Sequence, residues 1–334
     1  MMMACVISVI IPVYNAAPYL RECVESLIAS PCFPSGEILL VNDGSSDDSA
    51  EIVRAYTERY PNILAPVYEG PPWNRGPGAA RNLGLRHAHG QYIAFMDSDD
   101  RVQEQYHARL LERIRDTGTD IVFAGFSMWT DQGVTPYRRR VLESNGCFSG
   151  VDFLRARKKC RDGEGYSVCA LYRASLLREN GITFEEDINL CEDVLFTLRA
   201  ALAAKRVSVL PEYGYHYRQR PVSLVHSGQP LRDAENEIRV LEKFAEDERY
   251  RTDPVTWYFC VDIMSMCLYN LGLARDRGQI TGAQHEAYYR RVSCCVDWRA
   301  MWKNAETIKN RAKLALWRLD WRAFYPLVRK PEMR

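Results

Sequence analysis

The stretch YIAFMDSDD, residues 92–100, joins an apolar run to a cluster of three carboxylates. Its first five residues are apolar and rich in β-formers, which is typical of a buried strand. Asp97, Asp99 and Asp100 follow, with only Ser98 between them. Acids this close repel one another unless a cation lies among them, and Mg²⁺ or Mn²⁺ prefers oxygen ligands and shares them with substrate phosphates. The stretch therefore indicates a metal site, with capping of a following helix as the structural alternative, because Asp is a good N-cap.

Strand-like and helix-like segments alternate over the first hundred residues. The predicted strands are Val6–Ile11, Ile38–Val41, Ile63–Tyr68 and Tyr92–Met96, and the predicted helices are Tyr19–Ile28, Ser49–Tyr60 and Ala79–Ala88. Such alternation implies a largely parallel sheet with helices on both faces.

Polar residues follow three of these strands at the point where each strand ends. Tyr14 and Asn15 follow the first, Asp43 follows the second, and the acids of residues 97–100 follow the fourth. Because ligands of open α/β sheets bind outside the carboxyl ends of the strands, we expect these side chains to gather at one edge. The pattern predicts a site for a nucleotide and a metal ion.

The composition is that of a globular protein and excludes some classes. The chain has 334 residues, of which 47% are apolar and 26% charged, and its net charge of +1 argues against a broad nucleic-acid-binding surface. Eleven cysteines without CxxC spacing are expected to be reduced thiols of a cytoplasmic protein. The first residues lack the basic region of a signal peptide, and no run reaches the ~18 apolar residues of a membrane-spanning helix.

Four segments in this order and spacing resemble the family 2 inverting glycosyltransferases of the GT-A fold: VSVIIPVYN, LLVNDGSSDDS, GAARNLGL and YIAFMDSDD. The resemblance is close over about the first hundred residues and looser over Glu164–Ser223. It implies an α/β fold, a GT-A (Rossmann-like) mostly parallel sheet flanked by helices. It also implies a catalytic domain over residues 1–225, with a nucleotide-binding half, 1–100, and an acceptor-binding half, 101–225.

The same resemblance assigns the nucleoside pocket. Pro12, Tyr14 and Asn15 would line the base and ribose, and Asp43 would accept a hydrogen bond from the base, typically uracil. Arg81, in the GAARN segment, would contact the base or the diphosphate, with an ordinary helix salt bridge as the alternative.

The resemblance also assigns the metal ligands. Asp97 and Asp99 fill the acidic positions of the family's Asp-x-Asp motif, and Asp99 is the expected direct ligand of Mg²⁺ or Mn²⁺. Asp97 and Ser98 are further expected to contact the nucleotide sugar. The metal would bind both phosphates and neutralise the leaving nucleoside diphosphate.

A Glu-Asp pair supplies the candidate catalytic base. Leu190 and Val194 have helical spacing, so Glu192 and Asp193 lie at a helix start, where the helix dipole alone also favours acids. The pair matches the family's base motif, and its second acid, Asp193, would take the proton from the attacking hydroxyl.

Tyrosines at 213, 215 and 217 alternate as in an edge strand with an aromatic face. Similar family members have a Tyr-x-Tyr-Arg segment here that closes over the donor, so Arg218 or Arg220 would reach the diphosphate. The chain lacks the Gln-x-x-Arg-Trp motif and the membrane helices of processive synthases, which favours addition of a single sugar.

The remainder, residues 226–334, is predicted to be a helical appendage. The helices are Leu231–Glu248, Thr256–Arg275, Gly282–Val296 and Asn304–Phe324. Residues 301–334 hold nine Lys or Arg and three acids, and the last helix has two apolar stripes with cations between them. This pattern favours contact with an anionic membrane surface; burial on two sides or a dimer contact are the alternatives.

Together these features predict a metal-dependent inverting glycosyltransferase that moves one sugar from a nucleotide donor, UDP-linked by expectation, to a hydroxyl of a glycan or lipid-linked glycan. Cell-envelope or exopolysaccharide synthesis is the expected setting, in the cytoplasm or on the inner face of the membrane. A nucleotidyltransferase is one alternative, but residues 12–18 lack its Gly-rich loop. A catalytically inactive sugar-nucleotide-binding or scaffold protein is the other, and the intact acids count against it.

Overall fold

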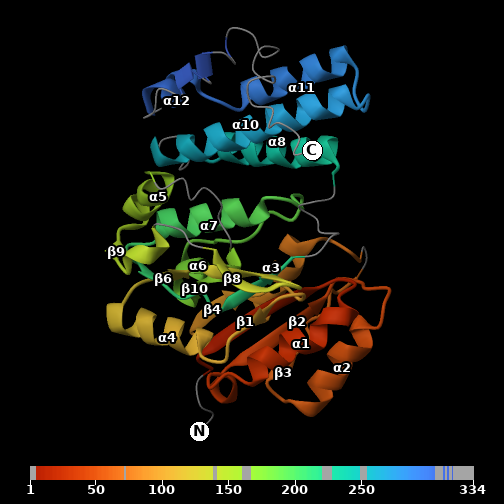
Figure 1. Cartoon of the computed structure of the whole chain (residues 1–334), viewed down its shortest axis with the longest axis vertical. Coiled ribbons are helices and arrows are strands. Elements are labelled where there is room, and N and C mark those ends of the chain that lie inside the picture. Colours follow the sequence, from red (N-terminus) through yellow and green to blue (C-terminus); the bar gives the residue numbers. More distant parts are fainter. Residues whose placement is uncertain are drawn as a thin grey trace. The chain divides into compact units, whose positions relative to one another are not determined.

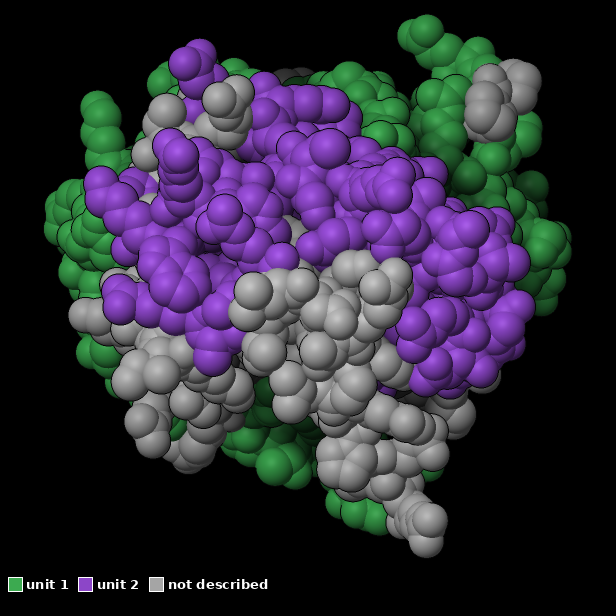
Figure 2. All heavy atoms as spheres, turned by 90° about the horizontal axis from the view of Figure 1, so that it is seen from above, with its two compact units in different colours: residues 1–221 green, residues 222–334 purple. Residues whose placement is uncertain are grey.

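The computed structural model describes residues 5–70, 73–137, 141–159, 167–219, 228–248 and 254–304, together with residues 311, 312, 314, 315 and 318. The chain divides into two compact units, residues 1–221 and residues 222–334 (Figure 2).

The first unit is built on a mixed eight-stranded sheet of order β3-β2-β1-β4-β10-β6-β11-β9 (Figure 1). The strands are β1 Ile7–Val13, β2 Glu37–Asn42, β3 Ile63–Leu64, β4 Tyr92–Phe95, β6 Ile121–Ala124, β9 Cys147–Phe148, β10 Ala170–Arg173 and β11 Val207–Leu210. Pairing is parallel from β3 to β4 and between β6 and β11, whereas β10 and β9 pair antiparallel with their neighbours. The α/β prediction is confirmed, with antiparallel strands in its second half.

Helices cover both faces of this sheet. Figure 1 shows α1 Ala17–Ile28, α2 Ser49–Arg59 and α4 Tyr106–Thr117 on one face, and α3 Pro77–His87 and α7 Glu192–Ala203 on the other. The shorter helices α5 Gly150–Lys159 and α6 Ala174–Glu179 pack against α7. The β-strands of residues 7–95 follow the predicted order, although β3 is shorter than expected because Pro66 has no N–H for a sheet hydrogen bond.

An aromatic cluster fixes the end of β4. Phe95, fully buried, meets Phe196 of α7 edge-on at 5.2 Å between ring centroids and Tyr172 of β10 at 6.0 Å. Phe184 stacks on Phe196 at 4.0 Å. Such pairs contribute about 0.5–1.5 kcal/mol beyond their buried area. The loop that carries the acids after β4 therefore begins at a rigid part of the core.

A second, four-stranded sheet has the order β5-β12-β7-β8. Its strands are β5 Arg101–Val102, β7 Phe126–Thr130, β8 Gly133–Tyr137 and β12 Tyr215–Arg218. The prediction that Tyr213–Tyr217 forms an edge strand is wrong, because β12 pairs with β5 on one side and β7 on the other. The apolar run Ile121–Phe126 is divided at Gly125, where a Cβ would lie 2.5 Å from a ring carbon of Tyr213, and its two parts enter different sheets.

The second unit is helical where it is described. Its helices are α8 Pro230–Glu246, α10 Pro254–Asp276, α11 Gly282–Cys294 and α12 Trp298–Asn304, and α10 packs along α8. Within the described residues α10 alone is long and apolar enough to cross a membrane, yet 65% of its apolar window is buried inside the protein. Almost all of the predicted helix Asn304–Phe324, and the candidate diphosphate contact Arg220, lie outside the described residues.

Candidate active site

The acids after β4 divide into two kinds. Asp97, Ser98 and Asp99 are partly exposed, whereas Asp100 is buried. The chain continues into β5 at Arg101, and the residue that precedes α4 is Gln105. The helix-capping alternative for these acids is therefore wrong.

Asp100 holds the acidic loop in place by accepting hydrogen bonds from two residues of β12. Its Oδ2 accepts a hydrogen bond of 2.6 Å from the Tyr215 hydroxyl, and its Oδ1 accepts one of 2.8 Å from the Arg218 backbone N–H. The Tyr215 oxygen in turn accepts from the Asp97 backbone N–H at 3.2 Å. Burial, with repulsion from Asp99 and Asp97, raises the pKa of Asp100 well above its usual range. The strand β12 is thus attached directly to the acidic loop.

Arg81 joins the acidic loop to the helix that carries the candidate base. Its Nη2 lies 2.8 Å from Asp97 Oδ1, and its Nη1 lies 2.7 Å from Glu192 Oε1. The Arg81 side chain is 6% exposed and that of Glu192 is 10% exposed. Burial opposes its charge, but the two carboxylates hold the pKa of Arg81 above its usual value. Both partners lie outside α3, so a helix salt bridge does not describe this contact.

Asp193 lies in the first turn of α7, directly after Glu192. Cys191 precedes the helix with a left-handed backbone, φ 68°. Burial, with repulsion from Glu192, raises the pKa of Asp193 to about 8, while Arg81 acts in the opposite direction. A carboxylate with such a pKa is a stronger base than an ordinary aspartate and suits proton abstraction near neutral pH.

Arg218 is held over an aromatic ring beside the same loop. Its Nε donates to the Asp99 backbone oxygen at 2.7 Å, and its Nη2 lies 2.6 Å from Glu22 Oε2. The guanidinium carbon lies 3.6 Å from the centre of the Trp129 ring, which Arg101 also approaches to 3.9 Å. Glu22 and Trp129 did not emerge from sequence reasoning, and no local pattern identifies them, because they reach Arg218 from distant segments.

The predicted nucleoside residues lie where β1 and β2 end. Val13 is paired with Asn42, so Tyr14 and Asp43 leave neighbouring parallel strands at the same edge. Tyr14 is 48% exposed, and the Asn15 amide oxygen accepts from the Ser46 backbone N–H at 2.8 Å.

Pro12 is half-buried inside β1, beside Val41. Asp43 is buried, and its two oxygens accept hydrogen bonds from the Arg75 and Gly76 backbone N–H groups at 2.9 and 2.7 Å. A carboxylate offers about four lone-pair sites, so Asp43 can accept a further hydrogen bond from a base. Because α3 begins at the next residue, Asp43 also anchors the helix that carries Arg81.

The donor set fits a phosphate-shared metal ion. Asp97 and Asp99 offer hard carboxylate oxygens two residues apart, and the Asp97 side chain is 32% exposed. No group of three or more His, Cys, Asp or Glu arranged to hold a metal occurs among the residues that the structure describes. Mg²⁺ characteristically uses one or two carboxylates and completes its shell with water and substrate phosphates. Two carboxylates at an open sheet edge match that requirement.

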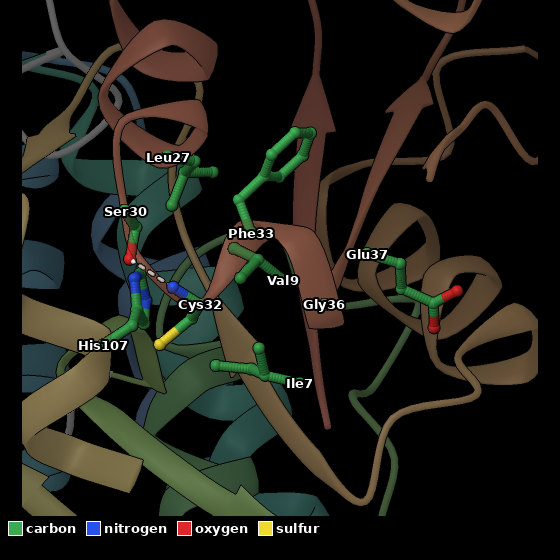
Figure 3. Close-up of a pocket in the computed structure, with 9 residues that line it drawn as sticks. All are labelled: Ile7, Val9, Leu27, Ser30, Cys32, Phe33, Gly36, Glu37 and His107. Carbon is green, nitrogen blue, oxygen red and sulfur yellow. Dashed lines mark hydrogen bonds between the residues drawn. The ribbon is translucent and has the colours of Figure 1, made fainter. Parts of the chain in front are cut away.

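A pocket elsewhere in the first unit is separate from this site (Figure 3). It is lined by Ile7 and Glu37, at the starts of β1 and β2, and by buried His107. The candidate site lies beyond the other ends of the same strands.

Comparison with known proteins identifies the family. Residues 8–181 match the family model described as "Glycosyl transferase family 2". The chain belongs to glycosyltransferase family 2. The "Uncharacterized glycosyltransferase EpsJ" of Bacillus subtilis is 36% identical over 220 residues, which are 65% of this chain and 62% of that protein. The Staphylococcus aureus "Poly(ribitol-phosphate) beta-N-acetylglucosaminyltransferase TarS" is 30% identical over 63% of this chain and 35% of its own length.

Solved structures show the same fold. The crystal structure of S. aureus TarS 1–349 in complex with UDP-GlcNAc superposes with a TM-score of 0.71 at 22% identity, covering 97% of this chain and 90% of that one. A Pyrobaculum calidifontis mannosyltransferase in complex with GDP-Man and Mn²⁺ gives a TM-score of 0.54 at 16% identity, covering 96% and 86%. The predicted family and GT-A fold are confirmed. The chain spans less than two thirds of the EpsJ and TarS sequences that it matches.

Proposed function

We propose that this family 2 protein is an inverting glycosyltransferase that transfers a single sugar from a nucleotide-diphosphate donor to a hydroxyl of a glycan or lipid-linked glycan. The observation that carries the proposal is the buried Arg81 bridge between Asp97 and Glu192, which joins the acidic loop to the base-bearing helix α7. UDP is the expected nucleotide, because TarS, a family relative, has been crystallised with UDP-GlcNAc. The division into a nucleotide-binding half, 1–100, and an acceptor-binding half, 101–225, belongs to the same proposal.

In the proposed reaction Asp193 removes the proton of the acceptor hydroxyl while the hydroxyl oxygen attacks the anomeric carbon of the donor sugar. The bond between that carbon and the diphosphate oxygen breaks on the opposite face, so the configuration inverts and the electron pair leaves with the nucleoside diphosphate. A positioned base contributes about 10²–10⁴-fold. The raised pKa of Asp193 matches this role, because the proton must be accepted near neutral pH.

Other residues of the site bind and orient the donor. Tyr14, Asn15 and Pro12 would border the base and ribose, and Asp43 would accept from the base. Arg218, whose guanidinium carbon lies 3.6 Å from the centre of the Trp129 ring, would present a planar donor for the diphosphate.

Asp97 and Asp99, with Ser98 between them, would hold a Mg²⁺ or Mn²⁺ ion that, when bound, neutralises charge on the diphosphate. Arg81 keeps Asp97 and Glu192 in place. Because its guanidinium is bound to these two carboxylates, we do not assign it a contact with the nucleotide.

The setting proposed is cell-envelope or exopolysaccharide synthesis, since TarS is named as a poly(ribitol-phosphate) glycosyltransferase. We place the protein in the cytoplasm or at the inner membrane surface, which the basic segment 301–334 would contact.

A thermal-shift panel of nucleotide sugars, with and without Mn²⁺, tests the proposal. The proteins are wild type, Asp99→Ala and the control Asp116→Ala, which removes an exposed acid of α4. A ligand at 100 times its Kd adds about 2.7 kcal/mol of stability. We expect one UDP-sugar to raise the melting temperature of wild type and of the control only when metal is present. The same sugar should leave the melting temperature of Asp99→Ala unchanged. If no nucleotide sugar stabilises wild type, the proposed function is wrong.

A further inference from the structure

Trp73 carries an exposed indole beside the proposed base pocket. The residue is 54% exposed, and it follows β3 in the loop that leads to α3. Tyr14, at the end of β1, is 48% exposed. A single exposed aromatic residue is common on protein surfaces and alone indicates nothing. What distinguishes Trp73 is how it is attached.

The first attachment is to the loop after β2. A Cβ placed on Gly44 would lie 2.7 Å from the Trp73 Cβ, so the two backbones approach as closely as only a glycine allows. Gly44 also has φ +78°, and it directly follows Asp43. The indole also lies near the buried ring of Tyr68, with 6.4 Å between the ring centroids and 50° between the ring planes.

The second attachment fixes the loop on the far side of Trp73. The backbone N–H groups of Arg75 and Gly76 donate to the two oxygens of Asp43. Arg75 also donates from Nη2 to the Gly70 carbonyl at 2.9 Å, and its guanidinium lies 4.6 Å from the ring centre of Tyr68. Trp73 therefore lies against Gly44, the residue after Asp43, and the backbone that follows Trp73 is bound to Asp43 itself, while the residue is 54% exposed.

We propose that Trp73 is a nucleobase contact of the donor site, on which the base of the nucleotide sugar stacks. The inference rests on the proposed function and adds a residue to it. Stacking on an aromatic face stabilises every base, whereas hydrogen bonding to a carboxylate selects among bases. Trp73 would thus supply affinity for the nucleoside, and Asp43 would supply preference for uracil.

Calorimetric titration in the presence of Mn²⁺ tests this assignment, with UDP and inorganic pyrophosphate as separate probes. The variants are Trp73→Ala, Trp73→Phe and the control Trp302→Ala, which removes an indole that is 48% exposed in the second unit. Trp73→Ala is expected to weaken UDP binding about 5- to 100-fold and to leave pyrophosphate affinity within about twofold. Trp73→Phe keeps UDP affinity within about threefold, because the aromatic face remains.

Tryptophan fluorescence gives a second readout. UDP should quench the emission of wild type and of Trp302→Phe, whereas Trp73→Phe should bind UDP and lose most of the quenching. The inference is overturned if Trp73→Ala binds UDP as tightly as wild type, or loses pyrophosphate affinity to the same extent as UDP affinity. If wild type binds no nucleotide at all, the proposed function and this inference fall together; if wild type binds and Trp73→Ala matches it, only the inference falls.

Discussion

Removing the Arg81 guanidinium should damage both the stability of the first unit and the pH dependence of catalysis. In Arg81→Met the Asp97 and Glu192 carboxylates lose their shared cation, which lies 2.8 and 2.7 Å away. Glu192 is only 10% exposed, so water cannot replace the lost partner fully. Breaking a buried ion pair by removing one partner costs about 3–5 kcal/mol. We expect a loss of that size in the free energy of unfolding, measured by urea denaturation.

The same variant should shift the acid limb of the rate profile to higher pH. Asp193 must be deprotonated to act as the base, so activity rises as pH increases through its pKa of about 8. Arg81 lowers that pKa, and its removal takes this effect away while repulsion from Glu192 and Asp97 remains. The pKa therefore rises, and kcat/KM measured against pH reports it.

Two matched variants separate the bridge from loss of a positive charge in general. Arg86→Met removes an exposed arginine of the same helix, whose distance to Glu186 is 4.0 Å, and should change stability by no more than about 0.5 kcal/mol. Arg81→Lys keeps the charge but lacks the fork that reaches two carboxylates, so it should rescue only part of the loss. Arg81 does not act as this bridge if Arg81→Met costs no more stability than Arg86→Met, or if the acid limb of Arg81→Met moves to lower pH.

Three further outcomes follow from single contacts. Asp193→Asn should lower kcat by about 10²–10⁴ while calorimetry finds the Kd of the donor within about threefold; loss of donor binding would contradict a base role. Gly76→Ala should lower the free energy of unfolding, measured in urea, by about 1–3 kcal/mol, because the backbone there has φ +95° and the new Cβ would lie 2.0 Å from Asn189 Oδ1. The control Gly70→Ala should be neutral, because no atom lies within 4 Å of a Cβ at that position. Equal effects of the two variants would contradict this prediction. Burial lowers the pKa of His107 to about 4, so the unfolded state binds its proton first and stability falls by up to about 3 kcal/mol between pH 6.5 and 4. The variant His107→Leu should lack this component, and identical pH curves would exclude it.

Local sequence predicted the strands and their ends well because both depend on short-range patterns. The apolar runs of β1, β2 and β4 are read directly from the sequence, and the predicted strand Ile38–Val41 lies within β2, Glu37–Asn42. The order of strand, turn and acid then places Tyr14, Asp43 and Asp97 at one edge.

Contacts between distant segments could not be read in this way. Arg81 meets Glu192 across 111 residues, and Glu22 meets Arg218 across 196. No spacing rule covers such distances, since the partners meet only when helices and sheets pack. For the same reason β12 was predicted as an edge strand: alternating tyrosines indicate a strand but not how many neighbours it has.

The four residues Asp97 to Asp100 illustrate how one acidic run serves two physical purposes. A sequence shows three equivalent carboxylates, but the turn after β4, in which the Asp100 N–H donates to the Asp97 carbonyl, directs Asp100 inward, to the Tyr215 hydroxyl and the Arg218 N–H. Asp97 and Asp99 remain at the surface, where a cation and phosphates can reach them. The buried acid holds β12 against the loop, so it fixes the distance between the proposed metal ligands and the Arg218 guanidinium. Asp100 thus affects donor binding indirectly, by fixing where the proposed metal ligands and the Arg218 guanidinium lie.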